Sequence, residues 1–175
     1  MKIAVLGYAG SGKTWLSDYI AKKRKMPVLH LDEIKWDKEW KPIDDSVVLP
    51  QVKEFMAQDD WIIDGWYEYL LMDERLEQAD KIYLLLLPRS TCFFSALKRS
   101  FSRRKEGYKN DLNWWFIKFL LFGCRSKERN KKYAEIAEKY KGKTCVITRR
   151  AQLNRRLNHR TCTHLHARRT KWRTL

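Results

Sequence analysis

The chain has 175 residues, of which 44% are hydrophobic and 13% aromatic, enough apolar material for one domain with a sizeable core. Its formal net charge is +16, yet no acidic residue follows Glu138, so the positive excess is concentrated in the last fifth of the chain. The opening apolar run is too short for a signal peptide, and the longest one, residues 114–124, contains Lys118 and is far below the roughly 18–20 residues that cross a bilayer. We expect a cytoplasmic protein without membrane contact.

Short apolar runs alternate with longer amphipathic segments along the chain. This alternation predicts an α/β fold, in which helices cover both faces of a parallel sheet. Five strands are expected, at residues 3–6, 28–31, 61–63, 82–87 and 145–147. Helices are expected between them, at about residues 13–25, 50–58, 69–78 and 91–105, with a long helical region at 112–140.

The first predicted strand leads into a glycine-rich loop. Residues 7–14, GYAGSGKT, match the pattern G-x-x-x-x-G-K-[ST] in full, and a predicted helix follows, which argues against a plain glycine turn. Glycines allow backbone N–H groups to turn toward phosphate oxygens, and the positive end of the helix points at the same oxygens. Lys13 is expected to reach the β and γ phosphates and Thr14 to ligate Mg²⁺. The residues expected to bind ATP are Gly7, Tyr8, Ala9, Gly10, Ser11, Gly12, Lys13 and Thr14.

Two carboxylates follow predicted strands, at the edge where ligands gather in a parallel sheet. Asp64 ends the strand at residues 61–63, where a carboxylate can position Mg²⁺; an Asp-Gly turn with Gly65 is the alternative. Asp32 ends the strand at residues 28–31, where it can take a proton from an acceptor hydroxyl; a helix cap is the alternative. His30 lies within that strand and is expected to be a packed core residue.

A basic helix is predicted after the fourth strand. Phosphoryl transfer develops negative charge, which arginine side chains stabilise. Arg89 follows the strand directly, and Arg99 and Arg103 share one helix face, so these three join Lys13 and Asp32 as candidate catalytic residues. A solvated basic face, or one that pairs with nucleic acid, is the alternative. The apolar segment at residues 114–122 is expected to pack against the domain, a membrane or partner surface being the less favoured interpretation.

The end of the chain differs in composition from the rest. We expect a domain over residues 1–158 and a basic tail over residues 159–175, which can bind nucleic acid or form a poorly ordered end. His159, Cys162, His164 and His166 lie close together in the tail, but no second pair at finger-like spacing accompanies them, which disfavours a metal site. The four cysteines lack CxxC spacing and are expected to be free thiols.

Three further elements are in register with the loop: HLD at residues 30–32, IDGWY at 63–67 and PRSTC at 88–92. Together they resemble the proteins labelled DNA topology modulation protein (FlaR-like), a branch of the adenylate-kinase-like P-loop kinases, over residues 1 to about 157. The resemblance implies a three-layer P-loop NTPase fold with a five-stranded parallel sheet, ATP on the loop and Asp32 facing the acceptor. It also implies a helical lid at about residues 90–125 that carries Arg99, Arg103 and Arg104.

The residues after Asp64 depart from the nucleotide-kinase relatives. Those relatives often follow Asp-Gly with Phe-Pro-Arg, whereas Gly65 is followed here by Trp66, Tyr67 and Glu68. This departure counts against a nucleoside monophosphate as the acceptor.

Three functions remain, in order of preference. The first is a kinase that transfers the γ-phosphoryl group of ATP, with Mg²⁺, to an unidentified small acceptor. The second is a nucleotide-dependent switch or hydrolase, and the third is a nucleic-acid-binding regulator, for which no helix-turn-helix, finger or RNP signature is present. Residues 130–133, NKKY, lack the Asp of the guanine-reading element Asn/Thr-Lys-x-Asp, so ATP is preferred over GTP.

Overall fold

The computed structural model describes residues 1–37, 39, 41–105 and 114–153. Residues 154–175 lie outside the described residues. They include the predicted end of the domain at residue 158 and the whole predicted tail at residues 159–175, with its His and Cys residues. Part of the predicted lid, residues 106–113, lies outside the described residues as well. Within the described residues, no helix combines the length and the apolar character needed to cross a membrane.

Five parallel strands form one sheet, as the alternating apolar runs predicted. The order across the sheet is β2-β3-β1-β4-β5. Strand β3 is buried along its whole length and β1 along all but its first residue, because helices cover both faces of the sheet. The strands span Lys2–Gly7 (β1), Val28–His30 (β2), Trp61–Asp64 (β3), Lys81–Leu85 (β4) and Thr144–Ile147 (β5).

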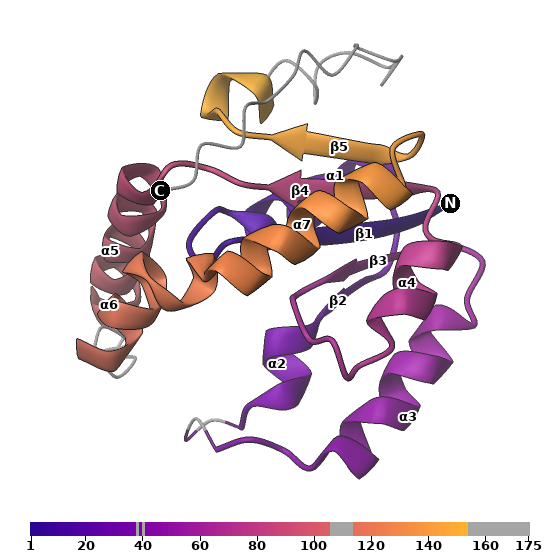
Figure 1. Ribbon diagram of the computed structural model, residues 1–175. Helices are drawn as coiled ribbons and strands as arrows, with labels where there is room; N and C mark the ends of the chain where they lie inside the picture. The colour runs from indigo at the N-terminus through magenta and orange to yellow at the C-terminus, as the bar shows by residue number, and fades with distance from the viewer. Residues whose placement is uncertain (38, 40, 106–113, 154–175) are drawn as a thin grey trace.

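Helices lie on both sides of this sheet, which makes three layers. Figure 1 shows α7 crossing in front of the sheet and α1 behind it. The helices are α1 (Lys13–Arg24), α2 (Leu31–Lys35), α3 (Asp45–Met56), α4 (Met72–Gln78), α5 (Arg89–Lys105), α6 (Trp114–Leu121) and α7 (Lys127–Lys139), and a 3₁₀ turn, η1 (Gly123–Arg125), separates α6 from α7.

Two helix predictions were wrong in detail, and one helix was not predicted. Helix α3 begins at Asp45 rather than at Pro50, because the Asp44 side chain accepts a hydrogen bond from the Ser46 N–H at 2.8 Å and caps the helix. The segment at residues 112–140 is interrupted after α6, and the Ser126 hydroxyl caps α7 by accepting from the Arg129 N–H at 3.2 Å. The short helix α2 was not predicted; it begins directly after β2.

The strand order reverses direction between β1 and β4. The chain leaves β1 toward β2 on one side and leaves β4 toward β5 on the other, and such a reversal marks the ligand site of an open parallel sheet. We call the edge formed by the carboxyl ends of the strands the carboxyl edge. Figure 1 shows that it faces α5 and α6 and that the loop after β1 lies there.

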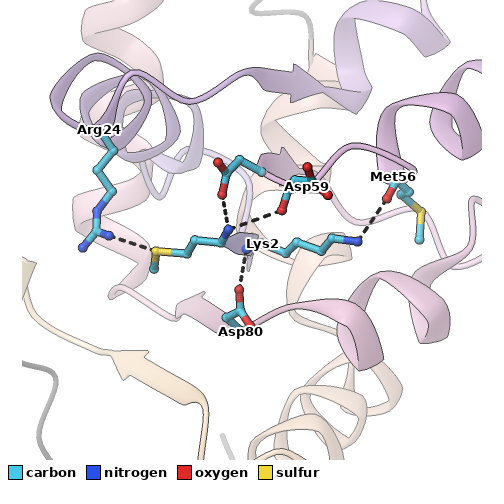
Figure 2. Close-up of polar contacts among 7 residues, drawn as sticks. Lys2, Arg24, Met56, Asp59 and Asp80 are labelled. Carbon is cyan, nitrogen blue, oxygen red and sulfur yellow. Dashed lines mark hydrogen bonds and ion pairs between the residues drawn. The ribbon is translucent and has the colours of Figure 1, made fainter.

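The opposite edge of the sheet is tied together by the first residues of the chain. The Lys2 backbone N–H donates to Asp80 Oδ2 at 2.7 Å, and its Nζ donates to the Met56 carbonyl at 3.3 Å (Figure 2). A hollow of about 640 Å³ lies here, lined by Lys2, Lys53, Met56, Ala57, Leu71, Glu74 and Gln78. Because the Lys2 amine is bonded to Met56 and to Gln78 Oε1, we assign this edge a structural role.

Candidate functional site

The glycine-rich loop has the backbone that its sequence predicts. Gly12 is the N-cap of α1 with φ +87°, a left-handed conformation that favours glycine, and no atom lies within 4 Å of the position a Cβ would take. The first N–H groups of α1 have no acceptor within the helix by geometry. The loop therefore leaves the space beside Gly12 open at the positive end of a 12-residue helix.

Two side chains in the loop fit a phosphate group. The Ser11 hydroxyl is buried and has no hydrogen-bond partner among the described residues. Lys13 Nζ donates to the Tyr8 carbonyl at 3.3 Å, so its ammonium group lies against the loop backbone. Thr14 is exposed in the first turn of α1. An anion in the loop would give the Ser11 hydroxyl a partner and would meet the Lys13 charge.

Tyr8 connects the loop to η1 and α7, a contact that the sequence did not predict. Its hydroxyl donates to Asn130 Oδ1 at 2.6 Å, and the Arg125 guanidinium lies 3.8 Å from its ring centroid. Arg125 also donates to the Leu87 carbonyl at 2.7 Å, which ties η1 to the chain just after β4. More than a hundred residues separate Tyr8 from these partners, so no local pattern could have indicated the contact.

Asp64 lies at the carboxyl edge and is bonded to a histidine. Its side chain is 1% exposed, and its Oδ2 is 3.0 Å from His30 Nδ1. The other ring nitrogen of His30 is 2.9 Å from Oδ1 of Asp18, an exposed residue of α1. The prediction that His30 is a packed core residue is wrong, because its ring joins two carboxylates from β3 and α1.

The bonds to two carboxylates favour the charged form of His30. The hydrogen bond to Asp64 is the largest cause, and together with the bond to Asp18 it outweighs burial and raises the His30 pKa to about 9. At neutral pH the ring is therefore a cation between two carboxylates. The carboxylate of Asp64 is thereby kept in a defined orientation at the carboxyl edge.

We expect this cluster to make stability depend on pH. A histidine whose pKa rises from 6.5 to about 9 on folding stabilises the folded state below pH 6.5, and this contribution disappears as the pH rises through 9. The shift corresponds to at most about 3 kcal/mol. Urea unfolding of the metal-free protein at pH 6, 7.5 and 9.5 should show this loss of free energy of unfolding, and His30→Gln should reduce it. Parallel pH curves for the two proteins would contradict the assignment.

Asp32 lies in the first turn of α2, directly after β2, and takes part in a second polar cluster. The Tyr67 hydroxyl donates to Asp32 Oδ1 at 2.6 Å. The same hydroxyl accepts from the indole N–H of Trp36 at 3.0 Å. Asp32 is not the N-cap of α2, a position that His30 occupies, so the alternative interpretation as a helix cap does not apply. Asp64 is the last residue of β3, and Asp32 comes shortly after the end of the neighbouring strand β2. Both carboxylates therefore lie at the carboxyl edge.

No protein-family model and no curated protein matches the chain. Among solved structures, the chain is similar to a shikimate kinase from Bacteroides thetaiotaomicron, with a TM-score of 0.50 and 18% identity over 90% of this chain and 95% of that one. A shikimate kinase from Aquifex aeolicus matches with a TM-score of 0.41 and 17% identity over 85% of each chain.

The chain has a P-loop NTPase fold of the α/β class. This confirms the fold class, with its five-stranded parallel sheet, that the sequence predicted. Membership in the FlaR-like family stays a prediction.

The candidate arginines all belong to α5, at the carboxyl edge. Arg89 is exposed at the start of the helix, with its guanidinium 5.8 Å from the Phe122 ring centroid. Arg99 is exposed and is the last residue of α5 whose side chain the structure describes. Arg103 belongs to the last turn of the helix, and its side chain lies outside the described residues. Their catalytic roles stay predictions.

Proposed function

We propose that the chain is an ATP-dependent phosphotransferase that moves the γ-phosphoryl group to a hydroxyl of a small acceptor. The observation that carries this proposal is the placement of Asp32: an exposed carboxylate, oriented by Tyr67, at the same sheet edge as a complete P-loop. A nucleotide-dependent switch needs the loop but not a second oriented carboxylate beside Asp64, whereas phosphoryl transfer to a hydroxyl can use one as a base. The similarity in fold to a kinase agrees with this proposal.

ATP would be held by the backbone of residues 7–14, by Ser11 and by Lys13, and Mg²⁺ by Thr14 with Asp64 orienting its water ligands. When bound, Mg²⁺ would supply charge neutralisation at the β and γ phosphates. Lys13 places a positive charge over the same oxygens. Asp32 takes the proton from the acceptor hydroxyl. At the same time the acceptor oxygen bonds to the γ-phosphorus, and the bond between that phosphorus and the ADP oxygen breaks.

A screen of phosphate acceptors tests the proposal. ADP formation would be measured with ATP and Mg²⁺ in the presence of polyols, hydroxy acids including shikimate, sugars, nucleosides and nucleoside monophosphates, and compared with the rate without acceptor. We expect at least one hydroxyl compound to raise the rate and to appear as a phosphorylated product by mass spectrometry. ATP turnover that no compound stimulates would favour the hydrolase instead.

Replacement of Asp64 separates the metal role from the proton role. We expect Asp64→Asn to require more Mg²⁺ for ATP binding, since one negative charge that orients the hydrated cation is lost. The matched control is Asp18→Asn, which removes the other carboxylate bonded to the same histidine. Calorimetric titration of ATP at several Mg²⁺ concentrations would measure both variants. Equal Mg²⁺ dependence of the two variants would contradict the metal role of Asp64.

A further inference from the structure

A buried arginine donates hydrogen bonds to the backbone of the loop that follows β3. Arg75 of α4 is 1% exposed, and its guanidinium donates to the Tyr67 carbonyl at 2.8 Å and to the Gly65 carbonyl at 3.4 Å. Burial lowers its pKa to about 10, so it remains a cation at neutral pH. A buried cation that loses its acceptors is costly, so Arg75 disfavours any conformation in which the two carbonyls turn away.

The same loop approaches α2 closely. Gly65 has φ +127°, and a Cβ there would lie 2.9 Å from Cβ of Leu31, the residue before Asp32. Only a glycine allows this approach without displacement. The backbone of the loop is thus held by the hydrogen bonds from Arg75 and by its close packing against Leu31. In this position the Tyr67 hydroxyl reaches Asp32.

The hydrogen bonds of the Tyr67 hydroxyl define what it can do. Its single proton is donated to Asp32 Oδ1, and it accepts the indole proton of Trp36. Burial, with the Asp32 charge as a smaller cause, raises the Tyr67 pKa, so the phenol remains a donor over the physiological range. Asp32 Oδ2 has no hydrogen bond to any described residue, which leaves this oxygen available to a ligand.

We propose that Tyr67 is a positioning residue that fixes the Asp32 carboxylate through Oδ1 so that Oδ2 faces the acceptor hydroxyl, with Trp36 and Arg75 fixing Tyr67 in turn. This inference rests on the proposed function, because it assigns a proton to Asp32. It gives a physical role to Tyr67 in the stretch where nucleotide kinases often carry Phe-Pro-Arg. In this proposal Trp36 and Tyr67 together orient the Asp32 carboxylate toward the acceptor hydroxyl.

The test compares Tyr67→Phe with Tyr69→Phe, a neighbouring exposed tyrosine whose hydroxyl has no hydrogen bond to a described residue. We expect Tyr67→Phe to slow single-turnover transfer by about 10- to 100-fold while the affinity for ATP with Mg²⁺ changes less than about twofold. The Tyr69→Phe variant should retain the wild-type rate. Transfer would be measured with the acceptor from the screen or, if none is found, as ATP hydrolysis with water as acceptor.

A double-mutant cycle with Asp32→Asn distinguishes positioning from a general structural role. If Tyr67 acts through Asp32, adding Tyr67→Phe to Asp32→Asn should cause little further loss of rate. Losses that multiply, or a full rate for Tyr67→Phe alone, would overturn the proposal.

The hydrogen-bond chain is tested separately in the protein without ligands. The indole ¹H–¹⁵N resonance of Trp36 should move in Tyr67→Phe and remain in place in Tyr69→Phe; an unmoved resonance in Tyr67→Phe would also overturn the proposal. Because this measurement involves no phosphoryl transfer, a failure of the kinase assignment would show in the acceptor screen while the resonance still moved.

Discussion

Lys13→Ala is expected to slow phosphoryl transfer by about 10²- to 10³-fold, the usual loss when one group that stabilises transition-state charge is removed. The only hydrogen bond of Lys13 Nζ to a described residue is the one to the Tyr8 carbonyl, at 3.3 Å. The side chain therefore contributes charge to the loop and little to the core. We expect the thermal unfolding of the variant to match that of the wild type within a few degrees.

The matched control for this replacement is Lys22→Ala, which removes the same charge from the exposed last turn of α1. Single-turnover assays with labelled ATP and calorimetric measurement of ATP affinity would be made on both variants. Lys22→Ala should leave both quantities unchanged. A Lys13→Ala protein with full activity and normal ATP affinity would show that residues 7–14 do not bind the phosphates.

The fold could be predicted from the sequence because its strands are continuous apolar runs. A strand covered on both faces, such as β3, reads as Trp-Ile-Ile before its terminal aspartate, and no helical period competes with this pattern. The loop could be predicted because glycine and lysine spacing is a local property. Helix α2 was not predicted because its five residues are too few to show a helical period of apolar residues. The start of α3 was predicted too late because Pro, a common first helical residue, lies inside this helix at Pro50.

The candidate site could be predicted only in part, because its connections are not local. Asp32 and Asp64 were found from their positions after strands, but their partners come from other elements. The ring of His30 lies between α1 and β3, and Tyr67 is 35 residues from the carboxylate to which it donates. The alternation of apolar residues assigns His30 to a strand but does not say which polar groups meet its ring. These partners decide the orientation and charge of the site.

Among replacements of the carboxylates, Asp32→Asn is expected to reduce the transfer rate most. Its effect should differ from that of Asp64→Asn, which is expected to change the Mg²⁺ dependence. If Asp32 takes the proton of the acceptor hydroxyl, Asp32→Asn should slow transfer by about 10²- to 10⁴-fold, because an amide cannot accept that proton. ATP and Mg²⁺ binding should remain near normal, since neither oxygen of Asp32 is assigned to the metal or to ATP. Asparagine can still accept the Tyr67 hydrogen bond, so the loss would report chemistry rather than folding.

Glu33→Gln is the matched control, because it removes the neighbouring exposed carboxylate of α2. Single-turnover transfer and ATP affinity across a Mg²⁺ titration would be measured for Asp32→Asn, Glu33→Gln and Asp64→Asn together. Equal losses for Asp32→Asn and Glu33→Gln would indicate a general effect of charge at α2. If Asp32→Asn changes the Mg²⁺ dependence and Asp64→Asn does not, then the carboxylate that orients the metal is the one after β2 rather than the one at the end of β3. In that case the bond from Tyr67 would orient a metal-binding group instead of a base.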